Sequence, residues 1–302
     1  MLDLDFAFFN LRKQDRRGLI YRKSILDRLA PLFFSPRVEK LIHLDGLNSR
    51  GCNILLPLGP GNLRLLDAEK QENISQRSTE ILEDYQLPAM AVDRLHKEQL
   101  RLLFPSLPLV FGDNFIKALA SVFVRKIHSR RGIRKLIITG ETEYFPEFIA
   151  ETAALGVPVS LQSTHPSRDE ILAYHLLYEK GQAVSTSYLN PEKWERGELV
   201  LMFDPDMRQM AISSPRAFCI KFSDQVKGLS REMENHLAGN GIDPALHNLA
   251  PILEISLLAK AGFFAPNAEQ DNAREEEGRK FLLLQELGNQ TGLWELFLDK
   301  AI

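Results

Sequence analysis

The sequence predicts an α/β protein with a smaller N-terminal α/β domain, a doubly wound parallel sheet and C-terminal helices. Three observations indicate this fold class. Residues 135–162 have the pattern of a buried strand, a turn, an amphipathic helix and a second buried strand. Short apolar segments alternate with helical patterns on both sides of this stretch, which is typical of parallel sheets. From residue 246 onward the pattern is mainly helical.

The stretch at 135–162 is expected to open the doubly wound sheet. Its first apolar run, Leu136–Ile138, is short and continuous and ends at Gly140, as in a strand that is covered on both faces. A helix should follow, with Pro146 in its first turn and Gly156 at its end. Such a unit is the first half of a mononucleotide-binding fold.

The remaining elements are expected in alternating order. Before the bridging segment, the expected helices are 24–34, 74–85 and 95–104, and the expected strands are 52–57, 89–92 and 107–111. After residue 162, the expected strands are 183–185, 199–203 and 217–222, and the expected helices include 167–180, 246–262 and 294–298.

We therefore expect three regions along the chain. Residues 1–130 should form an N-terminal α/β domain that ends in a long bridging helix, with apolar residues from 116 to 127. Residues 131–245 should form the nucleotide-type domain. Residues 246–302 should supply helices that return to the body of the protein.

Composition excludes several classes of function. The chain has 302 residues and a formal net charge of −3, which gives no reason to expect nucleic-acid binding. Cys52 and Cys219 lie far apart and the N-terminus has no export-signal pattern, so we expect a cytoplasmic protein. No segment approaches about 18 uninterrupted apolar residues, so no membrane span is expected. The histidines and cysteines have no metal-ligand spacing, so no metal site is expected.

Residues 125–135, RKIHSRRGIRK, form a dense basic run with six Lys or Arg in eleven positions. Cations are favoured at the carboxyl end of a helix, so a solvated helix end explains the run. The alternative is docking of an acidic partner, either an acyl carrier protein or a nucleotide phosphate. The apolar face of the last helix must pack against the body or against a second subunit, which leaves a homodimer open.

Polar residues follow the second strand of the nucleotide-type domain. The end of this strand is where the adenosine ribose of a dinucleotide lies. Ser163, Thr164 and Arg168 are therefore candidates to hold a 2′-phosphate, which would make the cofactor NADP rather than NAD. A structural explanation is also available, because Ser167 and Glu170 have the spacing of a helix capping box.

Two segments resemble a group of two-domain dehydrogenases and reductases. Residues 108–114, PLVFGDN, are similar to the Gly-Asn-containing start of the bridging helix in shikimate dehydrogenase, glutamyl-tRNA reductase and, more closely, acyl-acyl-carrier-protein reductase. Residues 135–162 resemble the opening of their cofactor domain. The resemblance covers the order of elements over about residues 54–260. It implies a Rossmann-like NAD(P)-dependent oxidoreductase that reduces an acyl thioester or a small carbonyl substrate.

The resemblance also suggests a nucleophile. In the acyl reductases a cysteine on a late strand of the cofactor domain takes the acyl group as a thioester, and Cys219 in AFCIKFSD has a similar context. Such a thiol needs a nearby cation to attack at neutral pH. Lys221 is expected on the same face of the strand and is the candidate for that role. The alternative is that Cys219 is a small buried apolar residue.

The predicted cofactor turn differs from that of the family. By the resemblance, Gly140, Glu141 and Thr142 line the pyrophosphate, and Asp204 lies near the nicotinamide at the end of the fourth strand. The family's turn is rich in glycine, whereas only Gly140 remains here. The carboxylates of Glu141, Glu143 and Asp204 would repel a phosphate.

Two hypotheses follow from these residues. The first is a divergent NAD(P)-dependent oxidoreductase with a small-molecule substrate. The second is a non-catalytic descendant of the same fold, which has lost dinucleotide binding and binds a different small molecule or a protein partner.

Overall fold

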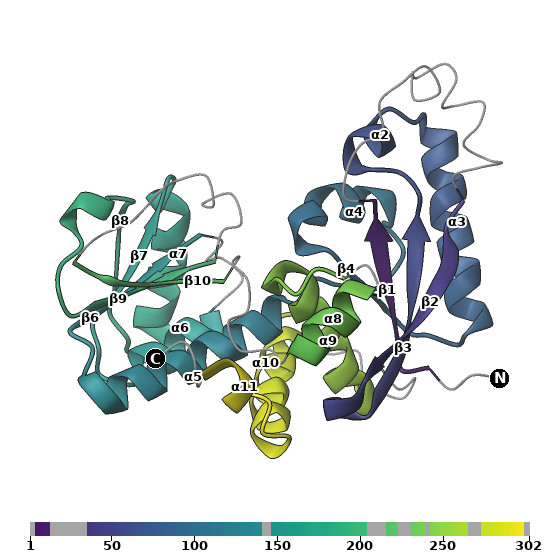
Figure 1. Ribbon diagram of the computed structural model, residues 1–302. Helices are drawn as coiled ribbons and strands as arrows, with labels where there is room; N and C mark the ends of the chain where they lie inside the picture. The colour runs from purple at the N-terminus through teal and green to yellow at the C-terminus, as the bar shows by residue number, and fades with distance from the viewer. Residues whose placement is uncertain are drawn as a thin grey trace. The chain divides into compact units, whose positions relative to one another are not determined.

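The computed structural model describes residues 4–12, 35–140, 146–203, 216–222, 231–239, 242–264 and 273–298. The expected helix at 24–34 and the candidate residues Glu141, Thr142 and Asp204 lie outside these ranges. The chain forms two compact units (Figure 1). The first contains residues 1–113, 230–244 and 248–270, and the second contains residues 114–229, 245–247 and 271–302.

The first unit is built on a five-stranded sheet in the order β2-β3-β1-β4-β5. Its strands are β1 (Phe6–Leu11), β2 (Arg37–Leu44), β3 (Ser49–Leu56), β4 (Met90–Val92) and β5 (Leu109–Val110). β2 runs antiparallel to β3, and the other neighbours are parallel. β1 is the central strand, because Phe8 has Asn53 of β3 on one side and Ala91 of β4 on the other.

Two helices cover one face of this sheet. The helical elements of the first unit are η2 (Asp45–Leu47), α2 (Pro60–Arg64), α3 (Ala68–Asp84), η3 (Arg94–His96), α4 (Lys97–Leu103), α8 (Arg231–Gly239) and most of α9 (Leu246–Lys260). Ile74 of α3 and Leu100 of α4 belong to the same core cluster as Phe9 and Ile54 of the sheet. α3 begins where Asp67 accepts a hydrogen bond from the backbone N–H of Lys70 at 2.9 Å.

The second unit contains a parallel five-stranded sheet in the order β10-β9-β6-β7-β8. Its strands are β6 (Lys135–Thr139), β7 (Val159–Ser163), β8 (Val184–Tyr188), β9 (Glu198–Met202) and β10 (Phe218–Lys221). In chain order this is 3-2-1-4-5, the arrangement of a doubly wound Rossmann-type sheet. Ile138 of the central strand lies between Leu161 and Leu201. The predicted fold class is therefore confirmed.

Aromatic side chains pack beside this sheet. The helices of the second unit are α5 (Asp113–Arg131, apart from Asp113 itself), α6 (Pro146–Ala153), α7 (Pro166–Lys180), η4 (Pro191–Lys193), α10 (Ala273–Gln290) and α11 (Glu295–Leu298). The ring of Phe203, just after β9, lies 5.6 Å from Phe148 of α6 and 4.9 Å from Phe222, measured between ring centroids. The ring of Trp294 lies 5.3 Å from Phe115 of α5. These contacts anchor α5 and α6 in the unit that contains the sheet.

The structure differs from the sequence expectations in two places. β1 and β2 were not predicted as strands, although β1 is central to its sheet. The expected capping box of Ser167 and Glu170 is wrong, because α7 begins at Pro166 and its N-cap residue is His165. From Asn114 onward, α5 belongs to the second unit.

The described ranges bear on two further classes, membrane-spanning and metal-binding proteins. None of the helices there is both long and apolar enough to cross a membrane. In the same part of the chain, no group of three or more His, Cys, Asp or Glu side chains could hold a metal ion.

Candidate functional site

The carboxyl edge of the second unit's sheet is the place where a doubly wound fold binds its ligand. The chain leaves β6 toward β7 and β8 on one side and returns to β9 on the other, so the topological switch point lies between β6 and β9. β6 ends at Thr139, and Gly140 follows with a φ of 107°. That φ lies in a region that residues with a Cβ rarely adopt, so a glycine is required at this turn.

The structure brings the predicted ribose-side residues together at the end of β7. The Ser163 hydroxyl donates to Asp169 Oδ2 at 2.6 Å and accepts from the His165 backbone N–H at 3.2 Å. Its role is therefore to order the start of α7. Thr164 and Arg168 are exposed, so their side chains are available to a ligand.

Helix α6 carries an acidic residue in its first turn. Glu147 is half-buried, and its Cγ would lie 3.3 Å from a Cβ added at Gly278 of α10. The side chain thus packs toward α10. A carboxylate in the first turn is stabilised by the partial positive charge at the N-terminus of the helix. A phosphate would bind to the same partial charge, so the two anions compete.

The predicted nucleophile lies in an apolar environment. Cys219 is half-buried on β10, packed against a cluster that contains Trp194, Val200 and Met202. Its Sγ lies 3.9 Å from the Ala217 carbonyl oxygen, to which it donates. Lys221 is two residues further along the strand and is also half-buried. The assignment of Cys219 and Lys221 as catalytic stays a prediction, and their surroundings are those of packed residues. The other cysteine, Cys52, is fully buried, and burial raises the pKa of its thiol to about 11.

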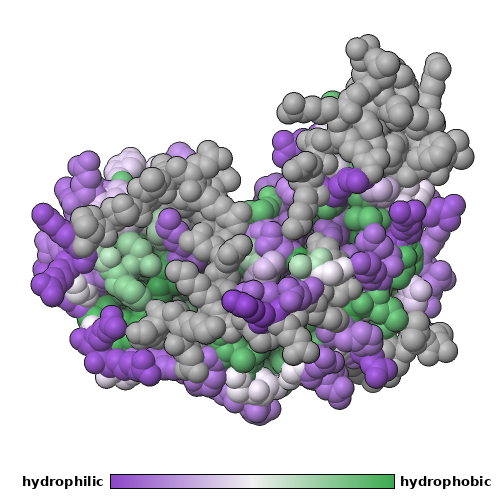
Figure 2. All heavy atoms as spheres, viewed as in Figure 1, coloured by the Kyte–Doolittle hydropathy of each residue, from purple (hydrophilic) through white to green (hydrophobic). Residues whose placement is uncertain are grey.

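The basic run at 125–135 is largely paired within its own unit. Arg125 pairs with Glu151, Lys126 Nζ lies 3.5 Å from Glu295, and Arg134 Nη1 lies 2.8 Å from Glu195. Hydrophilic residues cover the end of α5, at the lower left of Figure 2. Arg130, in the last turn of α5, is exposed. Cations are favoured at the carboxyl end of a helix, and these ion pairs lie on the surface, so the basic run has a structural explanation. Docking of an acidic partner stays a prediction.

The sequence analysis missed a charged cluster at the carboxyl edge of the first unit's sheet. We call it the Asp113 cluster, and it consists of Arg94, Lys97 and Asp113. β4 ends at Val92, and the chain turns directly into η3 and α4, which carry the two cations. β5 ends at Val110, and Gly112 leads into Asp113 at the start of α5. Because β4 and β5 are parallel neighbours, the residues that follow them lie close together.

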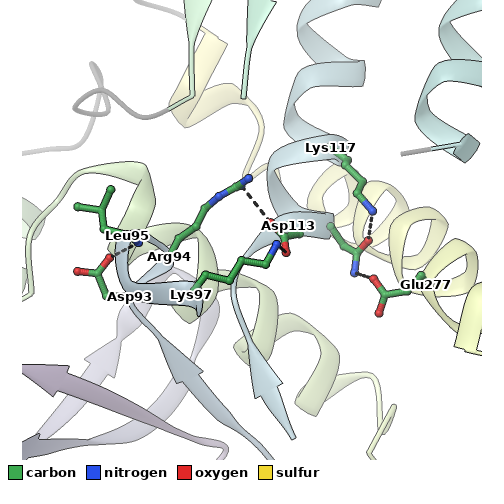
Figure 3. A network of polar contacts seen from close by, with 8 residues as sticks. Asp93, Arg94, Leu95, Lys97, Asp113, Lys117 and Glu277 are labelled. Atoms are coloured by element: carbon green, nitrogen blue, oxygen red, sulfur yellow. Dashed lines mark hydrogen bonds and ion pairs between the residues drawn. The ribbon is translucent and has the colours of Figure 1, made fainter. Parts of the chain in front are cut away.

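The geometry of the Asp113 cluster is compact (Figure 3). Lys97 Nζ donates to Asp113 Oδ2 at 2.9 Å, and Arg94 Nη1 lies 3.2 Å from Asp113 Oδ1. The side chains of Arg94, Lys97 and Asp113 are 4%, 8% and 18% exposed. Asp93 accepts from the Leu95 backbone N–H at 2.8 Å and so holds the turn that presents both cations. Charges this deeply buried need partners to be tolerated.

Two neighbours fix the cluster in place. The ring centroid of Phe111 lies 5.7 Å from Lys97 Nζ and 5.0 Å from the guanidinium carbon of Arg101. Gly112 has a φ of 78°, and a Cβ added there would lie 2.5 Å from the backbone N of Pro251. Only glycine allows this approach, so the turn that carries Asp113 is defined by packing against α9.

The next residue belongs to a second polar network, within the second unit. Asn114 Nδ2 donates to Glu277 Oε2 at 2.7 Å, and Lys117 Nζ donates to Asn114 Oδ1 at 3.0 Å. Lys280 Nζ lies 2.9 Å from Glu277. Burial alone would raise the pKa of Glu277, but the charge and hydrogen bond of Lys280, the hydrogen bond from Asn114 and the charge of Lys117 outweigh it, so the pKa is lowered. Burial would lower the pKa of Lys280, and Glu277 with Glu276 raises it instead.

A sequence signal for the Asp113 cluster did exist. Asp93 and Arg94 directly follow the buried segment AMAV, and Asp113 follows LVFG. Polar residues immediately after parallel strands share one sheet edge, which is where ligands bind in α/β folds. The sequence interpretation treated Asp113 as a helix cap and did not combine it with the end of β4.

Comparison with known proteins gave similarity at the level of the fold. No protein-family profile matches the chain, and no curated protein matches it. Fourteen chains of solved structures do match. The L-tryptophan dehydrogenase from Nostoc punctiforme gives a TM-score of 0.38 at 9% identity and covers 98% of this chain and 86% of its own. The shikimate 5-dehydrogenase from Thermus thermophilus, in complex with NADP(H) and shikimate, gives 0.30 at 11% identity, with 92% and 99% covered.

A third match is the 5-ketofructose reductase of Gluconobacter sp. strain CHM43, with a TM-score of 0.30 at 10% identity and 92% and 98% covered. These scores do not identify an activity for this chain. The resemblance to acyl-acyl-carrier-protein reductase and glutamyl-tRNA reductase stays a prediction.

Proposed function

We propose that this protein is an NADP-dependent oxidoreductase that acts on a small carbonyl substrate. One observation carries the proposal. The second unit has the 3-2-1-4-5 parallel order, with a glycine in a left-handed conformation at the end of its central strand. That is the position where a doubly wound fold accepts a dinucleotide. When bound, the nicotinamide group supplies the hydride, and the residues of this chain bind and orient it.

The choice of NADP over NAD rests on the end of β7. NAD-dependent sheets usually carry an acidic residue there, which binds the ribose 2′-hydroxyl, whereas an arginine accommodates a 2′-phosphate. β7 ends in Ser163 instead of an acid, and Arg168 is exposed in the first turn of α7. Thr164 offers a further hydroxyl beside it. The predicted pair Thr164 and Arg168 therefore supports a phosphate ligand, with Ser163 positioning the loop.

The acyl-thioester form of this reaction has weaker support. It needs Cys219 as a nucleophile, yet Cys219 packs against the cluster that contains Trp194 and lies two residues before the end of β10. A thiolate is disfavoured in apolar surroundings. We therefore propose direct hydride transfer to a carbonyl group, without a covalent intermediate on Cys219.

The second candidate is a non-catalytic protein of the same fold that binds no dinucleotide. The observation that favours it is the acidic character around the cofactor turn. Glu141 and Glu143 follow Gly140 in sequence, and Glu147 occupies the first turn of α6. Each carboxylate weakens phosphate binding at a helix N-terminus.

Binding of NADPH and NADH by isothermal titration calorimetry separates the two candidates. The proposal expects NADPH to bind and the Arg168→Ala variant to bind it about 10- to 100-fold more weakly, because one charge-assisted contact is worth about 1.5–3 kcal/mol. Affinity for NADH should stay the same. The matched control is Arg196→Ala, since Arg196 is an exposed arginine just before β9, at the opposite edge of the same sheet. If neither nucleotide binds at millimolar concentration, the non-catalytic candidate replaces the proposal.

A further inference from the structure

The guanidinium of Arg94 is buried without the hydrogen bonds that such a group requires. Its side chain is 4% exposed, and its Nη1 and Nη2 have no hydrogen-bond partner among the residues that the structure describes. The Asp113 carboxylate lies 3.2 Å from Nη1 but is not aligned for a hydrogen bond. The ion pair with Asp113 therefore compensates the charge of Arg94 but leaves the N–H groups of Nη1 and Nη2 without hydrogen bonds.

Such a state is costly in a protein that binds nothing at this position. Buried polar groups are nearly always hydrogen-bonded, and a buried charge with unsatisfied donors destabilises the fold. An arginine presents five N–H donors in a planar fork, which matches the two oxygens of a carboxylate or phosphate. A buried arginine with two unused terminal nitrogens is therefore arranged for an oxyanion.

Lys97 and Asp113 make the site suitable for such a ligand. Both Lys97 and Arg94 point toward Asp113 from the same turn (Figure 3). Asp113 holds the two cations in place, and its 18% exposed side chain indicates that solvent reaches the cluster. The cluster lies after β4 and β5, at the edge of a parallel sheet where α/β folds bind ligands.

We infer that the Asp113 cluster is a binding site for an oxyanion, in which the Nη1 and Nη2 donors of Arg94 hold two oxygens of a carboxylate or phosphate group. Asp113 positions Arg94, and Lys97 adds positive charge. The three residues of the site all belong to the first unit, and the inference does not depend on the proposed function. A free small carboxylate and a phosphate monoester share the chemistry that this site recognises.

The test is the melting temperature of the full-length protein with sodium pyruvate and with inorganic phosphate. Each is added at about 50 mM, with ionic strength matched by sodium chloride, because a ligand that binds only the folded state raises the melting temperature. We expect at least one of the two anions to raise it by about 3 °C. The anion that gives the larger shift identifies the source of the oxyanion group. No shift with either anion overturns the inference.

Variants separate this site from the alternatives. Arg94→Met should lose the shift, while its melting temperature without anion should equal or exceed that of the wild type, since a buried unsatisfied cation has been removed. Arg101→Gln is the matched control, because Arg101 also lies beside Phe111 but is exposed, and it should keep the shift. Arg168→Ala should keep it too, which excludes binding of phosphate at the nucleotide edge. An Arg94→Met variant that is clearly less stable or fails to fold would assign Arg94 a purely structural role and refute the inference.

Discussion

The two sheets present different chemistry at their carboxyl edges. In the first unit, the buried cations Arg94 and Lys97 each lie within 3.2 Å of the half-buried Asp113 carboxylate, at the ends of β4 and β5. In the second unit, β6 ends next to Gly140, which has a φ of 107°, and the candidate residues Thr164 and Arg168 are exposed. The side chains at the first edge are held by ion pairs, whereas Thr164 and Arg168 at the second edge are exposed. A ligand that used the exposed pair would have to order it upon binding.

The largest effect is expected when the carboxylate is removed from the first edge. Asp113→Asn leaves Arg94 and Lys97 without their shared negative partner, and breaking a buried ion pair in this way costs about 3–5 kcal/mol. The matched change in the second unit is Asp169→Asn, because Asp169 is also buried but accepts from the neutral Ser163 hydroxyl. That variant should lose about 1 kcal/mol. Urea unfolding measures both, and equal losses would contradict the difference between the two edges.

A smaller effect is expected from the turn that presents Asp113. Gly112→Ala forces a Cβ to within 2.5 Å of the Pro251 backbone at a φ of 78°, and we expect a loss of about 2–4 kcal/mol from strain and overpacking. Gly132→Ala is the control, because Gly132 has a φ of 69° but no atom within 4 Å of an added Cβ. It should lose only about 1 kcal/mol. If Gly112→Ala costs no more than Gly132→Ala, packing against α9 does not define the turn.

The smallest effect is expected on the pH dependence of stability, from the network of Asn114, Lys117, Glu277 and Lys280. The pKa of Glu277 is lowered in the folded state, so its stabilisation is present above the ordinary glutamate pKa and is lost as the pH falls through the lowered value. Glu277→Gln should therefore be less stable than the wild type at pH 7, by no more than about 1 kcal/mol for this partly exposed group. The difference should be smaller at pH 3 than at pH 7. Urea midpoints at both pH values measure this, and a difference that grows on acidification would reverse the assigned sign.

Several elements could be predicted from the sequence because their signals are local. The run Leu136–Ile138, the helix that starts at Pro146 and the strand β7 follow from hydrophobic periodicity and from proline and glycine positions. β2 was missed because it is an edge strand with several exposed charged residues and no clean alternation. β1 was missed because FAFFNL is a short apolar run near the terminus, and periodicity alone does not assign such a run to a strand.

The sequence by itself determined the fold class of the second unit and the candidate residues around Gly140, Thr164 and Arg168. The tertiary structure decided that Arg94 and Lys97, which follow β4, meet Asp113, which follows β5. It also decided that Asn114 meets Glu277, 163 residues away. The physical reason is that periodicity reports how each segment is buried, whereas the meeting of side chains from different segments depends on strand order and on turns such as Gly112, whose φ is fixed by packing.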